Sequence, residues 1–172
     1  MYEKLLNFQK SVFWKKIDSI NNFFLILTGS LAVLLIFLTV LSRYVFKVDL
    51  YGLEEIITVV AFWLYFVGGA RGSMEDSHIK ADLVDVFVKN VKLKYFIKAI
   101  AKLIEGFTEL VLGYLAIKLL ILNFERMPVT SSLKIPFIIP QFPVAIGFLM
   151  MGCFSMYYAL LFYLKCKRGR ED

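Results

Sequence analysis

Apolar residues occur in four long blocks that alternate with shorter polar segments, a pattern typical of a membrane protein. The first block, 20–42, contains no charged residue and is long enough to cross a hydrocarbon core of about 30 Å as one helix. The chain continues from it into Arg43 without a small-x-small cleavage site, so we expect a retained anchor and not a removed signal peptide. The first block therefore predicts a transmembrane helix.

The second block is short, because Glu55 and Arg71 bound its apolar run. A helix over 53–72 nevertheless spans the hydrocarbon if both end residues extend toward the headgroups. We therefore count the second block as a span, with Arg71 fixing one of its ends.

The last block opens with three prolines: Pro136, Pro140 and Pro143. No charged residue then occurs before Lys165. Because proline suits the first turn of a helix but not its interior, we expect a bent approach along the membrane surface and then a helix over 143–164.

The third block, 95–122, is interrupted by charged residues that share one helical face at about 100° per residue. They are Lys98, Lys102, Glu105 and Glu109, with Gly106 and Gly113 close to the same side. Lipid tolerates such a polar stripe poorly, whereas glycine lets another helix come near. We expect Lys102, Glu105 and Glu109 to face a partner.

Lysine and arginine are distributed unevenly between the segments that connect the blocks. If the amino terminus is cytoplasmic, most of them fall inside, and the outer loops hold only Arg43, Lys47, Arg126 and Lys134. The positive-inside rule therefore predicts that both termini are cytoplasmic.

The segment between the second and third spans contains the only histidine, His78. An enzyme could use Glu75, His78 and Asp82 on one helical face, or Asp82 with Asp85 as a carboxylate pair. However, one histidine with scattered acids does not provide the three or four ligands of a metal site. We expect no catalytic, cofactor-binding or metal-binding residue here.

The same segment is better described as an amphipathic helix over 78–90. One face carries an apolar stripe: Ile79, Leu83, Val86 and Phe87. Such a helix lies along the membrane surface, with Arg71 and the following lysines near anionic headgroups. His78 and Asp82 would then cap or anchor it.

On the outer side, Arg43 follows the first span, and Glu54 and Glu55 open the second. A charge near hydrocarbon is tolerated when it is paired, so an arginine–glutamate pair closing this hairpin is expected. A docking surface for an outside partner is the functional alternative, and the two are compatible.

Composition agrees with a membrane location, since 59% of the residues are hydrophobic and the mean hydropathy is +0.71. The net charge of +6 does not indicate nucleic-acid binding, because the basic residues flank apolar blocks. Cys153 and Cys166 fall on one helix about 20 Å apart and cannot bond to each other. The sequence thus predicts an all-α integral membrane protein with four transmembrane helices and one membrane domain, 1–172.

Several of these residues, in this order, resemble the small membrane subunit of tripartite ATP-independent periplasmic (TRAP) transporters, the DctQ-type small permease. The similar segments are Arg43-Tyr44-Val45-Phe46, Gly52-Leu53-Glu54-Glu55, Trp63, Gly69-Ala70, His78-Ile79 with Asp82, and Pro136, Pro143 and Gly147 near the last span. The chain departs from the family at Phe137, where a tryptophan is frequent, and at Ala145, where a proline is frequent.

The resemblance implies a sodium-driven transporter of the bacterial cytoplasmic (inner) membrane for an organic acid, such as a C4-dicarboxylate, sialic acid or a similar carboxylate. The partners would be the large TRAP membrane subunit, which carries the substrate and sodium sites, a periplasmic substrate-binding protein and membrane lipids. This chain would brace the large subunit, help dock the binding protein, and hold no cofactor. Its interface or assembly residues would be Arg43, Glu54, Glu55, Arg71, His78, Asp82, Lys102, Glu105 and Glu109.

A second hypothesis is a self-contained membrane carrier or channel. Ionisable residues inside a membrane often mark a transport pathway, and Glu105, Glu109 and Lys118 are the candidates for lining one. The two hypotheses differ in whether this chain transports anything alone.

Overall fold

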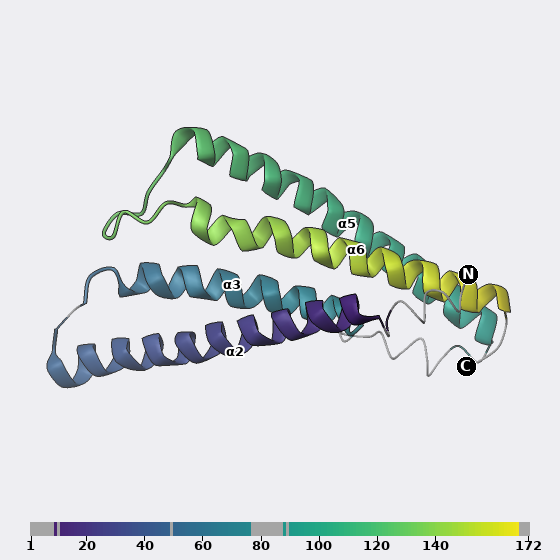
Figure 1. The fold of residues 1–172 in the computed structure, drawn as a ribbon, viewed down its shortest axis with the longest axis horizontal. Coiled ribbons are helices and arrows are strands. Elements are labelled where there is room, and N and C mark those ends of the chain that lie inside the picture. Colours follow the sequence, from purple (N-terminus) through teal and green to yellow (C-terminus); the bar gives the residue numbers. More distant parts are fainter. Residues whose placement is uncertain (1–8, 10, 49, 77–87, 89, 169–172) are drawn as a thin grey trace.

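The computed structural model describes residues 9, 11–48, 50–76, 88 and 90–168, and most of them are helical (Figure 1). Four helices are long and apolar enough to cross a membrane: α2 (Val12–Leu41), α3 (Leu53–Met74), α5 (Val91–Arg126) and α6 (Ile138–Arg168). A short π-helical segment, η1 (Ser42–Phe46), continues α2. The part of the chain that the structure describes contains no strand, so the predicted all-α architecture with four candidate spans is confirmed.

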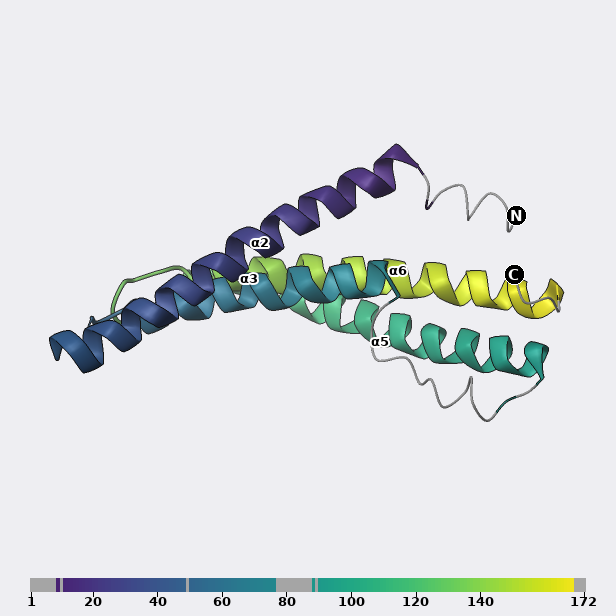
Figure 2. The same ribbon diagram turned by 90° about the horizontal axis from the view of Figure 1, so that it is seen from below.

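The helices lie in the order α2, α3, α6, α5 (Figure 1). α6 packs against α5 on one side and α3 on the other, while α2 packs along α3. Half of the most apolar stretch of α6 is buried, 50%, against 11% in each of the other three helices. The arrangement is therefore a layer centred on α6, and the first turn of α2 and the last turn of α6 lie at the same end of it (Figure 2).

All four helices extend beyond the predicted spans, α3 by only two residues, because residues at their ends continue the helical backbone. α2 begins at Val12, where the Ser11 side chain accepts a hydrogen bond from the backbone N–H of Trp14 at 3.2 Å. α5 begins at Val91, and the Asn90 side chain accepts from the N–H of Lys92 at 3.1 Å. Charged ends are compatible with a span because they reach the headgroup region.

The last helix begins at Ile138, so the predicted start at Pro143 was wrong. Pro140 lies in the first turn, where a backbone N–H has no partner inside the helix and its absence costs nothing. Pro143 lies inside the helix and is buried. The prolines are therefore incorporated into α6, and only Pro136 precedes it.

Glycines allow α5 and α6 to approach each other closely. A Cβ atom on Gly106 would lie 3.1 Å from the backbone nitrogen of Met156, and one on Gly152 would lie 2.8 Å from the side chain of Leu110. Gly113 faces Leu149 in the same way. Close backbone approach increases van der Waals contact, which is the main attraction between helices in lipid.

Trp63 connects three of the helices in the interior of the layer. Its ring centroid lies 6.0 Å from that of Phe24 in α2 and 6.2 Å from that of Phe142 in α6. Such separations are within the range of favourable aromatic contacts. α2 thus joins the layer through aromatic side chains.

The predicted interfacial helix over 78–90 lies outside the described residues, apart from 88 and 90. His78 and Asp82 belong to this part of the chain. Their proposed capping or anchoring roles stay predictions.

Candidate functional site

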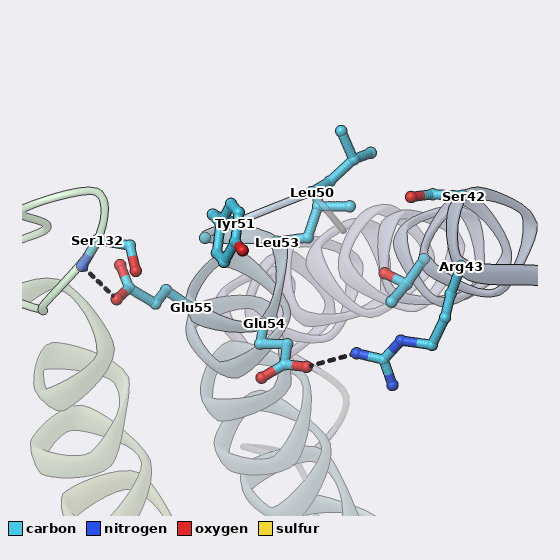
Figure 3. A pocket seen from close by; sticks show the side chains of 10 residues that line it. Ser42, Arg43, Leu50, Tyr51, Leu53, Glu54, Glu55 and Ser132 are labelled. Carbon is cyan, nitrogen blue, oxygen red and sulfur yellow. Dashed lines mark hydrogen bonds and ion pairs between the residues drawn. The ribbon is translucent and has the colours of Figure 1, made fainter. Parts of the chain in front are cut away.

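A pocket of about 290 Å³ opens where η1 turns into α3 (Figure 3). Ser42 and Arg43 line it from η1, Glu54 and Glu55 from the first turn of α3, and Ser132 from the loop between α5 and α6. Acidic residues in the first turn of a helix are favoured by the helix dipole. The pocket therefore combines a cation with two carboxylates at one end of the layer.

Arg43 and Glu54 form the ion pair that the sequence predicts for this hairpin. The guanidinium Nη2 lies 3.3 Å from Glu54 Oε1, and the two side chains are 57% and 78% exposed (Figure 3). An exposed pair contributes at most about 1 kcal/mol to stability. Both groups therefore remain accessible to a partner.

Glu55 does not pair with Arg43 but holds the loop between α5 and α6. Its carboxylate accepts hydrogen bonds from Thr130 Oγ1 at 2.6 Å, from the Ser132 N–H at 2.8 Å and from the Leu133 N–H at 2.9 Å. Hydrogen bonds to a charged acceptor are stronger than neutral ones. Glu55 thus ties the α2–α3 hairpin to the α5–α6 hairpin.

Gly52 completes this contact between the two loops. Its φ of 93° is one that glycine adopts without strain, and a Cβ atom there would lie 2.6 Å from Leu133 Cγ. Leu133 therefore packs directly over the backbone at Gly52. The sequence segment Gly52-Leu53-Glu54-Glu55 supplies both the turn and the carboxylate that fix the loop.

At the opposite end, Arg71 connects α3 to α2. Its Nε donates to Glu75 Oε1 at 2.8 Å, its Nη1 donates to the Asn22 side chain, and its Nη2 lies 3.7 Å from Asp18 Oδ1. Asp18 and Asn22 are one turn apart and so face α3 together. Arg71 therefore ties the end of α3 to α2 by contacts within the chain, and its role in fixing an end of the span stays a prediction.

Lys102 forms a second polar cluster at the same end. Its Nζ lies 3.1 Å from Asp76 Oδ1 and 2.9 Å from Glu105 Oε2, and the side chains of Lys102 and Asp76 are only 12% and 13% exposed. Ser155 of α6 donates to Glu105 at 3.3 Å. The cluster connects the end of α3 with α5 and α6.

These contacts change the interpretation of the polar stripe on α5. Sequence reasoning expected Lys102, Glu105 and Glu109 to face a second protein, whereas the structure places α6 of the same chain against Gly106 and Gly113. A helix within the chain therefore covers this side of α5. Any contact of the stripe with another protein is limited to the surface that α6 leaves exposed.

Tyr158 is a connecting residue that sequence reasoning missed. This buried side chain of α6 donates a hydrogen bond to the backbone oxygen of Met74 at 2.7 Å and accepts one from Gln9 Nε2 at 3.2 Å. It thereby joins the end of α3 to the segment before α2. A tyrosine in an apolar run carries no sequence signal for such a role.

The residues of the alternative hypotheses are only partly brought together, since Glu105 and Glu109 share a face of α5 that Lys118 does not. Lys118 is exposed on α5 and lies about 180° around the helix from Glu109 at 100° per residue, so these two do not line one pathway. Glu75 bonds to Arg71, and His78, Asp82 and Asp85 lie outside the described residues. Within the described ranges, no group of three or more His, Cys, Asp or Glu side chains is placed to hold a metal ion.

The family model described as "Tripartite ATP-independent periplasmic transporters, DctQ component" matches residues 32–162. The matched region extends from the last third of α2 almost to the end of α6. It includes the contacts of Arg43, Glu54, Glu55 and Lys102 described above, but not Asp18 and Asn22. No curated protein matches the chain. The family match confirms the resemblance seen in the sequence segments around Arg43 and Gly52.

Replacing Glu55 by alanine is expected to release the loop between α5 and α6. Each hydrogen bond to a charged group contributes about 1.5–3 kcal/mol, so the amides of Ser132 and Leu133 should exchange with deuterium roughly tenfold faster or more. Hydrogen–deuterium exchange of the purified chain in detergent measures this. Glu54→Ala is the matched control, and equal exchange in both variants would contradict the role of Glu55.

Replacing Lys102 by methionine is expected to destabilise the chain by about 3–5 kcal/mol, because Asp76 and Glu105 lose their shared cation in a poorly solvated position. The thermal unfolding midpoint in detergent should fall by several degrees. Lys118→Met removes an exposed lysine from the same helix and should leave the midpoint nearly unchanged. Equal midpoints for the two variants would show that the cluster does not stabilise the fold.

Proposed function

We propose that this chain, which belongs to the DctQ component family of tripartite ATP-independent periplasmic transporters, braces the large membrane subunit of its transporter. Membership of the family means that the chain is the small membrane subunit of a transporter. The chain itself has four helices able to cross a membrane. The proposal adds four points to family membership. They are the bracing role of this chain, its orientation in the membrane, the ion that drives transport and the class of substrate.

The layered arrangement of the helices carries the proposal. In the described residues α2 does not pack against α5, and it meets α6 through side chains such as Trp14, whose ring lies 5.1 Å from that of Phe154. The helices therefore do not close into a bundle around a central pathway. Many large apolar side chains of α2 and α5 remain exposed, whereas most side chains of α3 are at least partly buried. A layer of this kind has a broad apolar face to place against another membrane protein.

Polar ties at both ends of the layer support a bracing role. Glu55 connects the two hairpins at one end, and Lys102 with Tyr158 connects them at the other. Polar contacts at both ends of the helices oppose sliding of the α2–α3 hairpin along the α5–α6 hairpin. A large subunit that moves part of itself during transport would thereby gain a fixed support.

We further propose the orientation given by the positive-inside rule, with both termini cytoplasmic in a bacterial inner membrane. The pocket at Arg43 and Glu54 would then face the periplasm, where these exposed groups can help dock the substrate-binding protein. Sodium coupling and the site for an organic acid would reside in the large subunit. The resemblance of the sequence supports these assignments.

Transport in proteoliposomes tests the proposal. The large subunit, the binding protein and this chain together should take up the organic acid with a sodium gradient, and omission of this chain should lower the rate strongly. This chain alone should give no uptake. Uptake by this chain alone would contradict the bracing role and favour a carrier, whereas full uptake without it would show that no brace is needed.

A further inference from the structure

An apolar groove of about 370 Å³ lies between α5 and α6. Phe96, Ile100 and Leu103 line one wall, and Met156, Leu160 and Tyr163 line the other. Most of these side chains remain substantially exposed, although they face the densest helix contact of the layer. The groove is therefore apolar and open along the surface of the α5–α6 hairpin.

Neighbouring contacts give the depth of the groove in the membrane. α3 ends at Met74, and the groove begins at this level, because Leu103 follows Lys102, which pairs with Asp76. α5 has 36 residues and is about 54 Å long at 1.5 Å per residue, so it extends well beyond a hydrocarbon core of about 30 Å. The groove therefore lies where α5 crosses from the hydrocarbon core to the level of the headgroups.

Basic residues stand where the groove reaches the headgroup level. Lys92 lies one turn before Phe96 and Lys167 one turn after Tyr163, so each shares a helix face with a wall of the groove. Because α5 and α6 are antiparallel, both exposed lysines lie at the same end (Figure 1). No acidic residue occurs in 91–104 of α5 or in 138–168 of α6, so the two walls of the groove carry only basic charges at this end.

We propose that the groove binds one acyl chain of an anionic phospholipid, with Lys92 and Lys167 at its phosphate group. Basic sites between transmembrane helices at the cytoplasmic surface suit anionic headgroups, and an all-apolar groove suits a hydrocarbon chain. The charge complementarity at one end and the apolar lining along the rest select a lipid as the occupant. The bound lipid would support the part of α5 and α6 that extends beyond α3. This inference rests on the orientation proposed above but not on the bracing role.

Native mass spectrometry of the full chain in detergent tests the proposal with phosphatidylglycerol and phosphatidylcholine of identical acyl chains. The chain should retain phosphatidylglycerol at lower lipid concentration than phosphatidylcholine. Lys92→Gln with Lys167→Gln should weaken phosphatidylglycerol binding by roughly tenfold to thirtyfold, since each lysine near an anionic surface contributes about fivefold. Lys15→Gln with Lys16→Gln removes the same charge from the start of α2 and should have little effect.

Ile100→Trp provides an independent variant, because it fills the groove from an exposed position and should weaken binding of both lipids. An unchanged thermal midpoint confirms that each variant is folded. Equal binding of the two lipids, or equal losses in the two lysine pairs, would overturn the proposal. Loss of the phosphatidylglycerol adduct when the large subunit binds would also overturn it, because the groove would then be a protein interface.

Discussion

Lipid tails solvate an apolar helix about as well as apolar side chains do, so apolar burial alone provides little attraction between these four spans. The interfaces depend instead on close approach and on polar contacts. Gly106 and Gly152 bring α5 and α6 together, and Lys102 binds Asp76 and Glu105 where water is scarce. The same constraint explains why long apolar faces of α2 and α5 remain exposed in a stable arrangement.

The polar contacts are concentrated at the two ends of the layer. At one end Glu55 binds the α5–α6 loop over Gly52, and at the other Arg71, Lys102 and Tyr158 connect the helix ends. Polar groups are cheapest near the membrane surfaces, where headgroups and water can reach them. Polar contacts at both ends, with an apolar middle, therefore hold the two hairpins together in lipid. Such a rigid arrangement suits a subunit that supports a larger subunit with moving parts.

The sequence predicted the features that depend on residues close together along the chain, namely the spans and the Arg43–Glu54 ion pair. Long uncharged runs indicate spans, and Arg43 and Glu54 flank a short turn that brings them together. The partner of a polar side chain depends on tertiary packing, which a single sequence does not contain. For this reason the stripe at Glu105 was assigned to another protein although α6 covers it, and Glu55 was grouped with Arg43 although it binds Ser132 and Leu133. Thr130 and Ser132 in the α5–α6 loop were the available hint, because the polar N–H and hydroxyl groups of such a loop need hydrogen-bond acceptors.

The central claim is that this chain functions as a small subunit bound to a larger membrane protein. The most direct measurement is the mass of the complex extracted in mild detergent from the native membrane, with its components identified by mass spectrometry. The mass is expected to correspond to one copy of this chain with one copy of the large TRAP membrane subunit. A stable assembly that contains only copies of this chain would contradict it.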